Sequence, residues 1–112
     1  MKEEFQYWYK AFVTAVYDGD TITVDIDLGF GVVMHKQKIR LHGIDTPELR
    51  GREREQGIFA RDRVREMILK KEVQINTFKD KTGKYGRYLA RVHIDGHCIN
   101  DHLVAAGLAK RY

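Results

Sequence analysis

Three segments of this 112-residue chain combine acidic, basic and hydroxyl side chains in a pattern suited to phosphate chemistry. They are Asp18-Gly19-Asp20-Thr21, the stretch 39–48 ending in Asp45-Thr46-Pro47-Glu48, and the stretch 80–87 ending in Lys84-Tyr85-Gly86-Arg87. Carboxylates can hold a hard divalent cation, and guanidinium groups can grip a substrate anion. Each segment taken singly is also an ordinary turn, helix entry or basic loop, so only their combination indicates a site.

The charges are unevenly spread along the chain. The net charge is only +4, but residues 11–35 contain no Lys or Arg and four Asp, whereas six arginines fall between Arg50 and Arg65. An acidic cluster within a basic chain is what metal-assisted chemistry on a polyanion requires. A solvated strand face is the alternative explanation for the four aspartates.

Strands are expected to position the first two segments. Residues 6–16 are rich in aromatic and β-branched side chains, and Thr21–Asp27 alternates apolar with polar positions. A third strand is predicted over Val32–Ile44. Tight turns at Asp18-Gly19 and around residues 28–31 join the three strands, which excludes parallel crossover connections in this half of the chain.

The second half of the chain predicts a helix and then two further strands. Apolar residues recur at helical spacing from about Arg52 to Lys70, and the charges between them favour intrahelical ion pairs over a nucleic-acid-binding face. Strands are predicted over Glu72–Phe78 and Tyr88–Ile94. A short helix follows, with Asn100 as its N-cap and Gly107 as its C′ residue.

This order of elements predicts a mainly β (β+α) fold. We expect a five-stranded OB-type Greek-key barrel, with one helix between strands 3 and 4 and a short helix after strand 5. The apolar positions of the strands and the long helix supply the expected core, namely Ile22, Val24, Ile39, Leu41, Val73, Ile75 and Val92, with Val64 and Ile68 from the helix.

In this order and spacing, the three charged segments resemble those of the staphylococcal nuclease (thermonuclease) family. The resemblance runs from about Phe12 to Lys110 and ends in a matching Gly107-Leu108-Ala109-Lys110. It implies a single OB-fold domain over residues 1–112, without the C-terminal helix of the longer family members.

The resemblance implies an oxygen-ligated calcium site. Asp20 and Asp45 match the family's carboxylate ligands, and Thr46 matches the residue that contributes its backbone carbonyl. Asp18 would orient a ligand water. Oxygen donors suit Ca²⁺, whereas zinc prefers sites with thiolate or imidazole ligands.

The resemblance also implies which residues act on the substrate. Glu48 matches the family's general base, and Arg40 and Arg87 match the two guanidinium groups that grip the scissile phosphate. Lys84 and Tyr85 match residues that contact a second phosphate of the nucleotide.

The function that the resemblance implies is Ca²⁺-dependent hydrolysis of phosphodiester bonds. The substrate would be DNA, with RNA as a second candidate, cleaved with little sequence specificity to leave 3′-phosphate ends. The alternative is a non-catalytic OB-fold module that binds nucleic acid, which the intact acids and arginines argue against. We expect no membrane partner and a monomer by default, with an oligomer as the alternative because of the short C-terminal part.

The N-terminal residues lack the apolar core and the small-residue cleavage site of a signal peptide. A cytoplasmic location is therefore the default expectation, although a secreted protein whose leader has been removed would look the same. Cys98 is the only cysteine, which excludes a disulfide within the chain.

Overall fold

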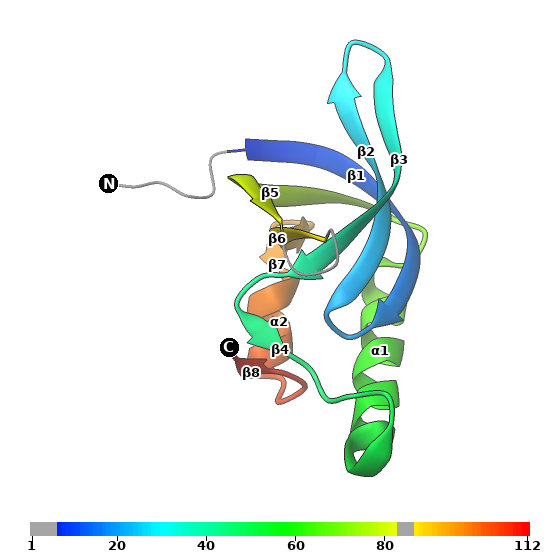
Figure 1. Cartoon of the computed structure of the whole chain (residues 1–112), viewed down its shortest axis with the longest axis vertical. Helices are drawn as coiled ribbons and strands as arrows, with labels where there is room; N and C mark the ends of the chain where they lie inside the picture. The colour runs from blue at the N-terminus through cyan, green and yellow to red at the C-terminus, as the bar shows by residue number, and fades with distance from the viewer. Residues whose placement is uncertain (1–6, 83–86) are drawn as a thin grey trace, which may run out of the picture.

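A computed structural model describes residues 7–82 and 87–112 (Figure 1). In chain order the elements are β1 (Tyr7–Asp18), β2 (Thr21–Gly29), β3 (Val32–Leu41), β4 (Ile44–Asp45), the 3₁₀ turn η1 (Gly51–Glu53), α1 (Arg54–Ile68), β5 (Glu72–Thr82), β6 (Tyr88–Ile94), β7 (His97–Cys98), α2 (Ile99–Ala105) and β8 (Lys110–Arg111).

The main sheet closes into a barrel. Its strand order is β3-β2-β1-β5-β6-β7, and β3 also pairs with β6, which joins the two sides of the sheet. That closing pair is parallel, with Ile39 opposite Tyr88, whereas the other pairs of this sheet are antiparallel. The expected five-stranded OB barrel with two helices is therefore confirmed. In Figure 1 the β2–β3 hairpin rises above the barrel, and both helices lie toward its lower end.

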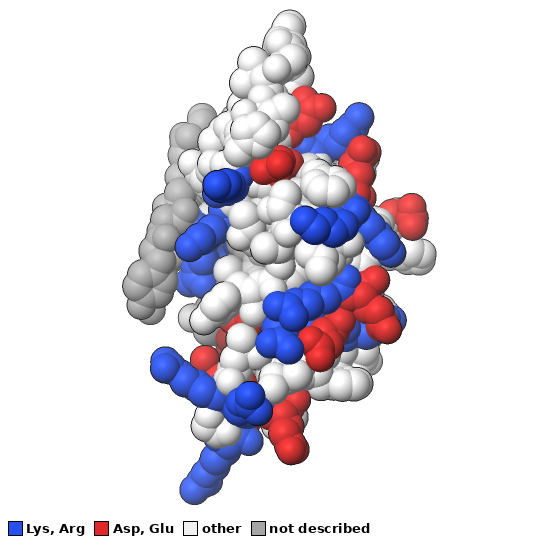
Figure 2. Space-filling model, turned by 90° about the vertical axis from the view of Figure 1, so that its right-hand side faces the viewer, with Lys and Arg blue, Asp and Glu red and all other residues white. Residues whose placement is uncertain are grey.

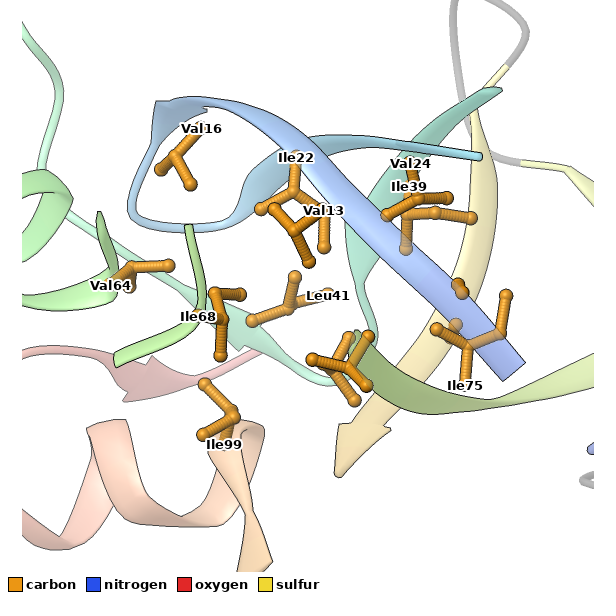
Figure 3. Close-up of a cluster of buried hydrophobic side chains, with 14 of the residues drawn as sticks. Val13, Val16, Ile22, Val24, Ile39, Leu41, Val64, Ile68, Ile75 and Ile99 are labelled. Atoms are coloured by element: carbon orange, nitrogen blue, oxygen red, sulfur yellow. The ribbon is translucent and has the colours of Figure 1, made fainter. Parts of the chain in front are cut away.

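The predicted core is confirmed residue by residue. All nine apolar residues expected there are at most 2 % exposed. Figure 3 shows Val64 and Ile68 of α1 and Ile99 of α2 pointing toward apolar side chains of the strands, among them Leu41. The strand alternation explains this arrangement, because every second residue of β2 faces inward and the intervening Thr and Asp residues face outward.

The predicted third strand is wrong at its end. β3 stops at Leu41, and only Ile44–Asp45 returns to an extended pairing, with β8 rather than with the main sheet. Gly43 has a φ of +78°, a conformation that does not continue a strand. This turn moves Asp45 away from the sheet, so its position depends on β8 as well as on β3.

The predicted N-cap of the second helix is also wrong. α2 begins at Ile99 after Cys98, and Asn100 lies inside the helix with 1 % exposure. Its Nδ2 donates to the carbonyls of His42 (2.9 Å) and Ala90 (3.2 Å), and its Oδ1 accepts from the Val92 amide (3.0 Å). The amide side chain satisfies backbone groups of two other segments, which outweighs its preference for a cap. Gly107 does take the predicted left-handed conformation after the helix, at φ +78°.

The expectation of intrahelical ion pairs is confirmed in α1. Arg61 pairs with Asp62 at 3.0 Å, and Arg63 pairs with Glu66 at 2.9 Å. On the face shown in Figure 2, basic and acidic side chains adjoin one another. Neither helix of the described chain combines the length and the apolar character needed to span a bilayer.

Candidate active site

Asp20 is the centre of a cluster that joins the first two charged segments. It lies in the turn between β1 and β2 and is 6 % exposed. Its Oδ2 accepts a hydrogen bond from the Thr46 backbone amide at 3.1 Å, and its Oδ1 accepts from the Thr21 hydroxyl at 3.3 Å. Because these bonds hold both carboxylate oxygens, the orientation of Asp20 is fixed by the fold.

Arg40 bridges the two carboxylates that were predicted to bind a metal. Its Nη1 lies 3.1 Å from Asp20 Oδ2, and its Nη2 lies 3.4 Å from Asp45 Oδ1. The strand explains its direction, since the neighbouring Ile39 and Leu41 face the core and the residue between them must face away. Asp20 and Asp45, which are 25 positions apart in the chain, therefore converge on one guanidinium group.

Arg87 approaches the same acid through a hydroxyl group. Its Nη1 donates to Thr21 Oγ1 at 3.3 Å, and that hydroxyl donates to Asp20. Arg87 directly precedes β6, so pairing of β3 with β6 is what brings it near Arg40. Sequence reasoning assigned no role to Thr21, and its place on the polar face of β2 was the available signal.

The remaining predicted site residues are Lys84, Tyr85 and Glu48. Lys84 and Tyr85 lie outside the residues that the structure describes. Glu48 is exposed, and its side chain makes no hydrogen bond or ion pair with any residue of the described ranges. Asp45, Thr46 and Glu48 share the wall of a pocket of about 240 Å³. Among the described residues the carboxylate of Glu48 is therefore unpaired, and it shares a pocket with Asp45.

Gly19, in the predicted turn, and Gly57, to which sequence reasoning assigned no role, both lie against the 46–48 loop. A Cβ atom on Gly19 would lie 2.7–2.9 Å from the side chain of Thr46, which is closer than packed atoms approach. A Cβ on Gly57 of α1 would overlap the Glu48 carbonyl oxygen and lie 2.9 Å from that of Pro47. The loop can take this path only because both positions lack a side chain.

Asp18 adds a second carboxylate beside Asp20. Its Oδ1 accepts the Asp20 backbone amide at 3.1 Å. Partial burial, together with the neighbouring Asp20 carboxylate, raises the pKa of Asp18 to about 6. This turn therefore holds two neighbouring carboxylates, of which Asp20 is paired with Arg40.

The donor groups at this cluster fit a hard cation such as Ca²⁺. Asp20 and Asp45 converge, the adjoining Thr46 carries a carbonyl oxygen, and the buried Thr46 hydroxyl has no hydrogen-bond partner among the described residues. The described chain contains no cluster of three or more His, Cys, Asp or Glu side chains suited to a metal. A site here would rest on two carboxylates completed by carbonyl and water oxygens, which is a composition that Ca²⁺ accepts.

Comparison with known proteins identifies relatives over most of the chain. A family model described as "Staphylococcal nuclease homologue" matches residues 38–112. A thermonuclease of Staphylococcus hyicus is 33 % identical over 101 residues, which cover 88 % of this chain and 56 % of the relative. A thermonuclease of Staphylococcus intermedius is 31 % identical with the same coverage, and endonuclease YncB of Bacillus subtilis is 33 % identical over 83 % of this chain and 43 % of its own length.

The chain thus spans about half the length of the relatives that it matches. The family model begins within β3, so it contains Arg40, Asp45, Glu48 and Arg87 of the cluster described above. This match, the barrel and the three relatives above 30 % identity agree with one another. The chain belongs to the staphylococcal nuclease family.

Proposed function

We propose that this protein is a metal-dependent nuclease that hydrolyses phosphodiester bonds of DNA, with RNA as a second substrate. The observation that carries the proposal is the convergence of Asp20, Arg40 and Asp45, with Arg87 joined to them through Thr21. A barrel has no structural need for two guanidinium groups and two carboxylates at one place. The relatives named thermonuclease and endonuclease support the same activity.

Arg40 and Arg87 are proposed to hold the scissile phosphate. A guanidinium group has five N–H donors, so contacts with two carboxylates and the Leu41 carbonyl still leave Arg40 with donors for a phosphate oxygen. Planar donor pairs match phosphate geometry and stabilise the negative charge that grows in the transition state. Asp20 and Asp45 fix the direction of Arg40 before the substrate arrives.

The cation is proposed to be Ca²⁺, held by the Asp20 and Asp45 carboxylates and the Thr46 carbonyl. Bound there, it would supply Lewis-acid stabilisation of the phosphate charge. The protein's own contribution is to orient the carboxylates, which Arg40 does for both and the Thr46 amide does for Asp20.

Glu48 is proposed to act as the general base, because its carboxylate has no partner in the described part of the chain and lines the same pocket as Asp45. It would take one proton from the attacking water while the water oxygen bonds to phosphorus. The bond from phosphorus to the 5′ oxygen then breaks, and that oxygen takes a proton from solvent. The products are a 3′-phosphate and a 5′-hydroxyl.

The proposal is tested with labelled single- and double-stranded DNA and RNA, each with Ca²⁺ or with a chelator. We expect Ca²⁺-dependent cleavage, and a fall in kcat of roughly 10²–10⁴-fold for Glu48→Gln and for Arg87→Lys. Glu72→Gln is the matched control, because Glu72 is exposed at the start of β5 and lines none of the pockets described. Binding without Ca²⁺-dependent cleavage would instead favour a non-catalytic nucleic-acid-binding module.

A further inference from the structure

A second hollow lies on the other side of the cluster, between the barrel and α1. Its volume is about 630 Å³, within the roughly 300–1,000 Å³ typical of ligand sites. Asp18, Thr21 and Arg87 belong to its lining, so the hollow adjoins the site described above. Its far wall comes from α1, which the proposed reaction does not use.

Basic side chains predominate in this hollow. The lining includes four cationic residues, Lys38, Arg61, Arg65 and Arg87, and one carboxylate, Asp18. Arg61 is paired with Asp62 at 3.0 Å, whereas Lys38 is exposed and makes no hydrogen bond or ion pair with the residues that the structure describes. The excess positive charge suits a polyanion.

The position of Lys38 relates the hollow to the scissile phosphate. Lys38 and Arg40 lie two residues apart on the same face of β3, which places their Cα atoms about 6.6–6.8 Å apart along the strand. This step is close to the length of one nucleotide in an extended strand. A polynucleotide with one phosphate at Arg40 can therefore present its next phosphate near Lys38.

The walls also offer a surface for a base. Tyr17 is 69 % exposed, and the apolar residues Ala15 and Leu49 also line the hollow. Arg65 donates to the Val16 carbonyl through Nε (3.3 Å) and Nη2 (3.0 Å), which ties α1 to β1 across the hollow. The hollow is thus already formed before a ligand arrives, and an unpaired base can stack on the tyrosine ring.

We infer that this hollow is a subsite for the nucleotide next to the scissile phosphate in single-stranded DNA. Lys38 and Arg61 contact the flanking phosphate, and Tyr17 stacks on the base. The inference rests on the proposed nuclease function for its link to cleavage, but binding of the strand can be measured without cleavage.

The kinetic test compares d(TpT), whose single phosphodiester occupies only the scissile position, with (dT)6. For the double variant Lys38→Gln/Arg61→Gln we expect kcat/KM on (dT)6 to fall about tenfold and kcat/KM on d(TpT) to stay within twofold. Tyr17→Ala should instead lower kcat/KM on both substrates, because d(TpT) also carries the base next to the scissile phosphate. The control Lys36→Gln/Arg63→Gln removes the same charges from the same two elements, outside the hollow, and should keep both rates.

The binding test uses fluorescein-labelled (dT)6 in chelator. The Kd should be about tenfold weaker for Lys38→Gln/Arg61→Gln than for the control pair, and the slope of log K against log salt should become shallower by about 0.7 for each lost phosphate contact. Equal losses in the two double variants would overturn the subsite. Absence of cleavage by the unaltered protein would overturn the nuclease proposal. The difference in Kd between the two double variants would still test whether the hollow binds the strand.

Discussion

Gly57 of α1 lies directly against the backbone carbonyl of Glu48. A Cβ atom at Gly57 would overlap that oxygen and lie 2.7 Å from the carbonyl carbon. In the same loop, the side chain of Thr46 lies against Gly19, which leaves room for it. The backbone path that presents Asp45, Thr46 and Glu48 is therefore set by two positions that take no part in the chemistry themselves.

Replacing Gly57 by Ala should destabilise the protein and impair cleavage. Helix propensity alone favours Ala by about 0.5–1 kcal/mol, but the overlap with backbone atoms should reverse the sign and cost about 1–3 kcal/mol. Displacement of Glu48 should lower kcat by roughly 10–100-fold. Urea unfolding and single-turnover kinetics measure the two effects. Gln56→Ala, at the preceding exposed position, should be neutral or stabilising, and equal behaviour of the two variants would contradict the close packing.

Replacing Asn100 by Ala should lower the free energy of unfolding by about 2–4 kcal/mol, because the His42 carbonyl and the Val92 amide would lose the bond to its side chain and the Ala90 carbonyl would keep only the His42 amide. Denaturant titration followed by circular dichroism measures this change. His102→Ala, at an exposed position of α2, serves as the control and should change stability by less than about 0.5 kcal/mol. A comparably small loss for Asn100→Ala would show that these bonds contribute little.

Asp101 should stabilise the fold in a pH-dependent manner. A hydrogen bond from Arg91 (2.7 Å), aided by the positive charges of Arg91 and Arg111, lowers the pKa of Asp101 below its usual value. A lowered pKa means that the stabilisation is complete above the unfolded-state pKa, near 3.9, and is lost as the pH falls through the lower pKa of the folded state.

We therefore expect Asp101→Asn to be less stable than the unaltered protein at pH 7 and the difference to shrink as the pH approaches about 2. The pair is half exposed, so the loss at pH 7 should stay below about 1 kcal/mol. Urea titrations at several pH values measure it. Asp95→Asn, at an exposed turn, should match the unaltered protein at every pH, and a constant deficit for Asp101→Asn would exclude an ionic cause.

Calcium should stabilise the folded protein. A ligand at one hundred times its Kd adds about 2.7 kcal/mol to the free energy of unfolding, which thermal melts in Ca²⁺ and in chelator can detect. Asp45→Asn should abolish most of this rise in Tm, whereas Asp27→Asn, an exposed aspartate of β2 outside the cluster, should keep it. An equal rise in both variants would place the calcium elsewhere.

The strands and the core could be predicted because their signals are local. Alternation in 21–27 separates the buried Ile22 and Val24 from the polar face, and this separation follows from strand geometry alone. The sequence was less informative where a residue has partners far along the chain. Asparagine is a preferred residue type for a helix N-cap. The bonds of Asn100 to His42 and Ala90 nevertheless place it inside the helix.

By itself, the sequence determined the order of elements, the barrel class, the family and the residue types available for chemistry. Only the tertiary structure decided which of these residues meet. Asp20, Arg40 and Asp45 converge, and Arg87 joins them through Thr21, because β3 pairs with β2 and β6 while β4 pairs with β8. These strand pairings join residues that are distant in the chain. The free energy that favours them comes from burying the shared core, so no local sequence pattern encodes them.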